Sequence, residues 1–120
     1  MNPSDVRQPL VDTELLVLRA MCQGTPQKRV WNEGVQILRD YRFRESDHQV
    51  IFETLREINT DDPRIIRGLL PTRLTNKGFP TIDVDTLFVP HNLTEGMAVM
   101  VMHSLCAAGV QFPLGKSTAA

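Results

Sequence analysis

Apolar residues recur at spacings of three and four along most of the chain, which indicates amphipathic α-helices. The first predicted helix begins with Asp12 as its N-cap and ends near Gly24, with one apolar face made by Leu15, Leu18 and Cys22. A second helix is predicted to start at Thr25 as N-cap, with a proline at its first position. Its apolar face comprises Trp31, Gly34, Val35 and Leu38. The glycine on that face is expected to allow a neighbouring helix to approach closely.

The middle of the chain predicts two further helices. Ser46 and Gln49 have the spacing of a capping box, which predicts a helix start at Ser46. The apolar stripe that follows comprises Ile51, Phe52, Leu55 and Ile58. Asp62 followed by a proline is a second start signal, and Gly78 is the predicted end of that helix. Pro71 lies inside it, so we expect either a kink or two short helices meeting at this position.

The last third of the chain predicts one short and one long helix. The short helix is expected to begin near Asp83 or Asp85 and to stop before Pro90. The long helix is expected to start at a box formed by Asn92 and Glu95, and to close at Gly109. The sequence therefore predicts an all-α fold, a compact bundle of five to six short helices. Residues 1–9 and 110–120 are expected to be flexible tails around a single domain at 10–109.

Composition limits the functions open to such a domain. The chain has 120 residues, is 42% hydrophobic, and carries a formal net charge of −1. These values predict one soluble globular domain without strong overall affinity for nucleic acid, because phosphate affinity comes from clustered cations. The N-terminal segment lacks an apolar signal region, and the longest apolar run, "MAVMVM", is too short to span a bilayer. Cys22 and Cys106 lie in apolar helical patterns and are expected to be reduced core residues of a cytoplasmic protein.

The sequence offers little catalytic chemistry. The tail "GVQFPLGKST" resembles a phosphate-binding loop, but five residues rather than four separate its glycines, and too few residues follow to form a helix. His48, His91 and His103 do not have the spacing of metal ligands. The paired aspartates lie where helix caps are expected. We therefore expect no enzyme activity, no catalytic residue, no bound metal and no cofactor.

The last predicted helix has a composition typical of an interface. Nearly every residue from Met97 to Cys106 is apolar, so one buried face cannot account for the helix. Two interpretations are open: a central core helix, or a surface that associates with another subunit. Methionines suit an adaptable contact surface. On the second interpretation the interface residues are Met97, Met100, Val101, Met102 and Leu105.

The loop between the second and third helices, "DYRFRE", mixes arginines with aromatic residues. One interpretation is a single-stranded nucleic-acid site, which needs exposed aromatic rings on a basic surface. Its contacts would be Arg39, Tyr41, Arg42 and Arg44. The favoured interpretation is structural, with Phe43 and Phe52 plugging the space between two helix ends, because carboxylates lie near each arginine.

The same order of residues resembles a known protein family. The helix "ELLVLRAM" is followed by "VWNEGVQIL", by the aromatic loop, by "DHQVIFETLREI" and by "RIIRGLLPTRLTNKG". This order is similar to the N-terminal, non-ATPase domain of the DnaB-type replicative DNA helicases of bacteria. The positions in register are Leu18, Met21, Phe43, His48, Ile51, Phe52, Leu74 and Gly78.

The resemblance implies a helical domain without catalysis of its own, which joins subunits through its C-terminal helices and contacts primase. We expect the chain to depart from the family in two respects, a missing motor domain after the match and the proline at position 71. The expected partners are therefore a second copy of the chain, with a homodimer as the default, and a replication protein such as a primase or helicase.

Overall fold

The computed structural model describes the backbone of residues 3–23 and 30–111, and the side chains of residues 8–23 and 30–108. The described residues form five α-helices and one short 3-10 helix, η1, and contain no strand. The elements are α1 (Pro3–Gln23), α2 (Val30–Ile37), α3 (Ser46–Ile58), α4 (Pro63–Asn76), η1 (Val84–Phe88) and α5 (Glu95–Gln111). The predicted all-α fold is thus confirmed.

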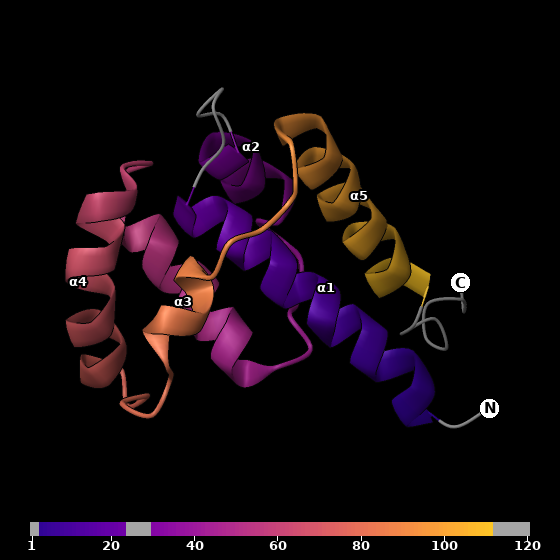
Figure 1. The fold of residues 1–120 in the computed structure, drawn as a ribbon. Coiled ribbons are helices and arrows are strands. Elements are labelled where there is room, and N and C mark those ends of the chain that lie inside the picture. Colours follow the sequence, from indigo (N-terminus) through magenta and orange to yellow (C-terminus); the bar gives the residue numbers. More distant parts are fainter. Residues whose placement is uncertain (1–2, 24–29, 112–120) are drawn as a thin grey trace.

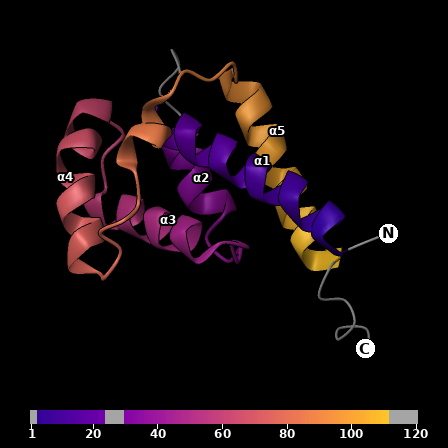
Figure 2. The same ribbon diagram turned by 60° about the horizontal axis from the view of Figure 1, so that its bottom comes forward.

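Helix α1 runs through the middle of the molecule (Figure 1). Helices α2 and α5 pack against it and against each other, and α5 runs antiparallel to α1 (Figures 1 and 2). Helices α3 and α4 form a second pair, and η1 joins them by packing on α1 and α4. As a result α4 and α5 lie at opposite edges of the molecule (Figure 1).

The core lies along α1, whose residues Val17, Leu18 and Met21 are completely buried. Gly34 of α2 faces this helix. A Cβ atom at position 34 would lie 2.8 Å from the sulfur of Met21 and 3.0 Å from the terminal methyl of Met102 on α5. The predicted role of this glycine is therefore confirmed: without a side chain it lets three helices meet closely.

Helix α1 begins at Pro3, so the predicted start at Asp12 is wrong. A proline at the first helical position is favourable, since its missing N–H has no intrahelical partner there anyway. Pro9 lies inside the helix but is exposed, where water can replace the lost hydrogen bond. Asp12 lies within the helix and accepts a hydrogen bond from Gln8 at 2.9 Å. It therefore acts as an i, i+4 partner and not as a cap.

Two predicted capping boxes are also wrong. The side-chain oxygen of Gln49 accepts from the backbone N–H of Phe43 at 2.9 Å, so the glutamine fixes the preceding loop instead of closing a box with Ser46. The cap of α3 is Glu45, one residue earlier. At the start of α5, Thr94 Oγ1 accepts from the Met97 N–H at 3.2 Å, in place of the predicted Asn92 box. Helix α5 also continues past Gly109 to Gln111.

The other local signals of helix ends are confirmed. Asp62 caps α4 by accepting from the Arg64 N–H at 2.9 Å, and Asp83 caps η1, which ends before Pro90. Helix α4 ends in a Schellman arrangement, in which Gly78 has a φ of 94° and lies just after the C-cap. The helix is continuous through Pro71, so two separate helices do not form. That proline is exposed, where water can bond the backbone it leaves unpaired.

Some predictions fall outside the described residues. These are the start of the second helix at Thr25 and most of the tail that resembles a phosphate-binding loop.

Candidate functional site

A buried carboxylate organises the loop between α2 and α3. Glu14 lies in the middle of α1 and is completely buried. Its Oε2 accepts from the Tyr41 hydroxyl at 2.5 Å and from the Arg44 backbone N–H at 2.8 Å. Its Oε1 lies 3.0 Å from Nδ1 of His48, at the start of α3. One side chain thus holds both the loop and the next helix against α1.

Burial of Tyr41, followed by its hydrogen bond to Glu14, raises the pKa of the phenol well above its usual range. The tyrosine is therefore a neutral donor to the carboxylate over the physiological pH range. His48 is also buried, and it can donate its Nδ1 proton to the same carboxylate. These donors solvate Glu14 in place of water, which is the usual requirement for a buried carboxylate. The cluster is a polar anchor for the loop.

The aromatic rings of the loop pack into the domain. Phe43 is buried, with its ring centroid 5.2 Å from that of Phe52 and 4.9 Å from that of Tyr41. This is the position assigned to the predicted plug. Arg39 and Arg42 are exposed, and Arg44 is half-buried. Tyr41 was predicted as a nucleic-acid contact, and this is wrong for a stacking role because its ring is buried and its hydroxyl is bound to Glu14.

The structure divides the five predicted interface residues of α5 into two groups. Met102 and Leu105 are buried against α1 and α2, so they belong to the domain's own core. Their assignment to the interface is therefore wrong. Val101 is half-buried. Met97 and Met100 point outward, with 49% and 69% of their surfaces exposed. The core interpretation therefore holds for one face of this helix, and the opposite face is exposed.

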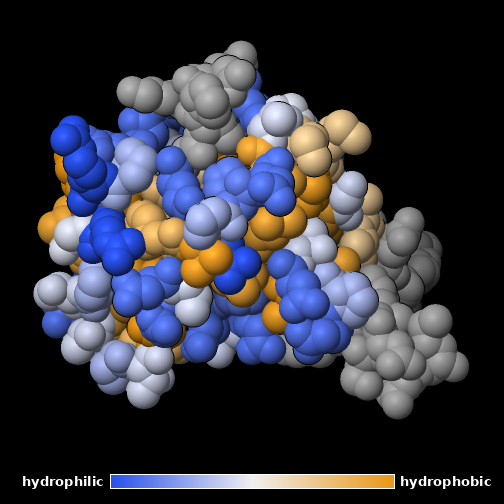
Figure 3. Space-filling model, viewed as in Figure 1, coloured by the Kyte–Doolittle hydropathy of each residue, from blue (hydrophilic) through white to orange (hydrophobic). Residues whose placement is uncertain are grey.

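The outer face of α5 carries no formal charge. After Glu95, the helix contains no aspartate, glutamate, lysine or arginine up to its end at Gln111. The remaining exposed residues between these two methionines and the end of the described side chains are His103, Ser104 and Ala107. Figure 3 shows pale orange, apolar atoms along this edge, whereas blue atoms cover much of the centre of the same view. A helix face of this composition is unusual for a surface exposed only to water.

The described residues include no group of three or more His, Cys, Asp or Glu side chains able to hold a metal ion. His91 accepts from the Leu93 N–H at 3.1 Å, and His103 is exposed on α5. Cys22 is buried, and this burial raises the pKa of its thiol to about 12, so it is a poor nucleophile near neutral pH. Cys106 is half-buried, and its thiol lies 3.4 Å from the Ile37 carbonyl oxygen.

Glu14 was missed as a site residue, although a signal for it exists. It lies four residues before Leu18 and seven before Met21, on the stripe of α1 that is buried. A charged residue on such a stripe predicts a buried partner, but its partners lie 27 to 34 positions away. Only the tertiary fold identifies them.

Comparison of the chain with family models, with curated proteins and with solved structures finds no match. The resemblance to the helicase N-terminal domain therefore stays a prediction. None of the described helices combines the length and the apolar character needed to cross a bilayer.

Proposed function

We propose that this chain is a non-catalytic interaction module that self-associates through the outer face of α5. The observation that carries the proposal is the exposure of Met97 and Met100 on a helix without formal charges after Glu95. Methionine side chains are flexible and polarisable, so they adapt to an opposing apolar surface. The absence of charge removes the desolvation cost that would oppose burial of this face.

The resemblance of the sequence to the helicase N-terminal domain supports the same class of function. Domains of the helicase family join subunits through their C-terminal helices, and α5 is the last helix of this domain. A role beside a replication protein, such as a primase or a helicase, is the corresponding proposal for its wider setting. The nucleic-acid alternative has weaker support, because the aromatic rings of the arginine loop are buried.

The size of the face sets the expected strength of association. A 17-residue helix is about 25 Å long, and one face about 10 Å wide covers a few hundred Å². Typical specific interfaces bury roughly 800 Å² on each partner. We therefore expect a reversible dimer with a dissociation constant of the order of 10–100 μM, and not a permanent one.

The test is the mass in solution, measured by light scattering from about 1 to 500 μM protein, a range that brackets this constant. The chain is expected to approach the dimer mass at the upper end. Met100→Glu should keep it monomeric, because dimerisation would bury two like charges. The matched control is Ile65→Glu, which places the same charge at an exposed apolar residue of α4, 47% exposed, and should dimerise normally. A monomer at every concentration, or equal masses for both variants, would refute the proposal.

A further inference from the structure

All charged residues of helix α4 are basic. Its 14 residues include Arg64, Arg67 and Arg73 and no carboxylate, and Lys77 follows directly. Two of these four cations have a carboxylate partner on a neighbouring segment. Arg67 binds Asp85 of η1 at 2.8 Å, and Lys77 binds Glu57 of α3 at 2.6 Å.

The guanidinium of Arg73 differs from these neighbours. Arg64 lies 3.7 Å from the cap residue Asp62, whereas no hydrogen bond or ion pair joins the side chain of Arg73 to any described residue. Arg73 is nevertheless half-buried. An arginine that gives up part of its hydration without gaining a partner leaves planar donors available to a ligand.

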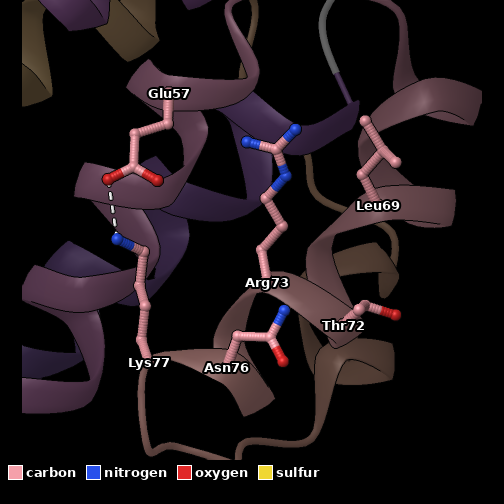
Figure 4. Close-up of a pocket in the computed structure, with 6 residues that line it drawn as sticks. All are labelled: Glu57, Leu69, Thr72, Arg73, Asn76 and Lys77. Carbon is pink, nitrogen blue, oxygen red and sulfur yellow. Dashed lines mark hydrogen bonds and ion pairs between the residues drawn. The ribbon is translucent and has the colours of Figure 1, made fainter.

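Arg73 lies in a groove between α3 and α4. The groove has a volume of about 330 Å³ and is lined by Glu57, Leu69, Thr72, Arg73, Asn76 and Lys77. Figure 4 shows the guanidinium between Leu69 on one side and the ion pair of Lys77 with Glu57 on the other. Because Lys77 already neutralises Glu57, the positive charge of Arg73 is not balanced inside the groove. The hydroxyl of Thr72 and the amide of Asn76 add hydrogen-bonding groups beside it.

An apolar row continues this groove along α4. Ile65 and Leu69 are one helical turn apart and are 47% and 39% exposed, whereas their neighbours Ile66 and Leu70 are buried in the core. The row from Ile65 to Asn76 spans about 16 Å, or three helical turns. Figure 3 shows orange atoms beside deep blue ones at this edge of the molecule. The surface therefore combines two exposed apolar side chains, Ile65 and Leu69, with the unbalanced positive charge of Arg73.

We propose that this surface docks an acidic amphipathic helix of a partner protein. A carboxylate of that helix binds the Arg73 guanidinium, and its apolar side chains pack on Ile65 and Leu69. Helical periodicity of the exposed row favours a helical occupant, since side chains of two helices interdigitate along their ridges. A carboxylate matches the guanidinium with two parallel hydrogen bonds.

The charges of the surface favour an acidic protein segment over nucleic acid. A phosphate backbone gains affinity from several cations at once, and here Arg67 and Lys77 are already paired. The docking site does not depend on self-association, because α4 and α5 lie at opposite edges of the molecule (Figure 1).

The probe is a capped 16-residue helical peptide of leucine, alanine and glutamate, with leucines on one face and glutamates beside them. A matched peptide carries glutamine at every glutamate. Titration into the ¹⁵N-labelled chain follows the Nε–H signal of Arg73, which is assigned by its loss in Arg73→Lys. Fluorescence anisotropy gives the affinities for the chain, for Arg73→Gln and for Arg42→Gln, which removes the same charge from an exposed position elsewhere.

The acidic peptide is expected to bind at least tenfold more tightly than its glutamine counterpart and to shift the Arg73 signal. Arg73→Gln should lose at least tenfold in affinity, whereas Arg42→Gln should change it less than twofold. The same result in Met100→Glu would show that docking is separate from self-association. Lack of binding, equal binding of the two peptides, or full affinity in Arg73→Gln would overturn the proposal. Arg73-dependent binding of a 20-nucleotide oligothymidine in place of the peptide would also overturn it.

Discussion

Removing the carboxylate at Glu14 should destabilise the whole domain. In Glu14→Ala, the Tyr41 hydroxyl, the Arg44 N–H and the Nδ1 atom of His48 lose their shared partner. A hydrogen bond to a charged group contributes about 1.5–3 kcal/mol, so simple addition would give about 4.5–9 kcal/mol. That sum is an upper bound, because the energies of interactions that share one cluster are not additive. A buried donor left without an acceptor costs about 1–3 kcal/mol, so loss of the acceptor shared by these three donors is expected to lower the free energy of unfolding by about 3–5 kcal/mol.

The assay is urea unfolding followed by far-UV circular dichroism and by the fluorescence of Trp31, the single tryptophan. The loss should appear as a lower midpoint at an unchanged slope, since the surface exposed on unfolding is similar. Glu14→Gln keeps a carbonyl oxygen for the Arg44 N–H and should lose about half as much. Glu53→Ala is the control, because it removes an exposed carboxylate that accepts one bond from Gln49. A decrease below about 1 kcal/mol in Glu14→Ala would refute the anchoring role, because surface changes alone reach about 0.5 kcal/mol.

Three further predictions follow from glycine packing and from buried titratable groups. Gly68→Ala should stabilise the chain by about 0.5–1 kcal/mol, since a Cβ atom at this position would meet no atom within 4 Å. Gly34→Ala should instead destabilise the chain by about 0–2 kcal/mol, because its Cβ atom would crowd the two methionines. Urea unfolding midpoints compare the two variants, and equal shifts would contradict the close approach at Gly34. Burial and the hydrogen bond to Glu14 raise the pKa of Tyr41, so the neutral phenol favours the folded state. Its contribution to the free energy of unfolding is complete below the ordinary pKa of about 10 and is lost as pH rises toward the raised value. Tyr41→Phe should therefore show a shallower loss of stability between about pH 9 and 11 than the parent chain in urea titrations, and parallel pH profiles would argue against this. Burial raises the pKa of the Cys22 thiol to about 12, so this thiol should react with a thiol reagent at pH 8 only after unfolding. The half-buried Cys106 should react measurably in the folded state. Equal reaction rates of the two thiols, measured by mass spectrometry, would contradict their different burial.

Sequence predicted the features that depend on neighbouring residues. The caps at Asp62 and Asp83 and the glycine after α4 are short-range devices, and each lies where it was expected. The capping boxes failed for a physical reason: the Gln49 side chain finds a better partner in the Phe43 N–H, six residues away. The predicted start of α1 is wrong because Asp12, a residue type favoured at N-caps, lies inside the helix and accepts a hydrogen bond from Gln8.

The candidate sites were predicted less completely, because they depend on which helix face meets another element. Composition identified α5 as too apolar for a single buried face, but it could not separate Met100, which is exposed, from Met102, which is buried. The unbalanced charge of Arg73 is likewise invisible in sequence, since the partners of its neighbours come from α3 and η1. Local patterns thus predict elements, whereas pairing between distant residues decides what the surface offers.

The central position of α1 has a consequence for how the chain folds during synthesis. Arg19 and Gln23 of α1 bind backbone carbonyls of the segment around η1, which lie 67 and 64 positions later in the chain. At about 5–20 residues per second, the ribosome needs roughly 3–13 s to add that stretch. During that interval η1 does not yet cover the apolar side of α1, and α5 is synthesised later still. Helix α1 therefore emerges before the other described helices but is among the last of them to be fully covered, so the nascent chain has a period in which its future core is accessible to chaperones.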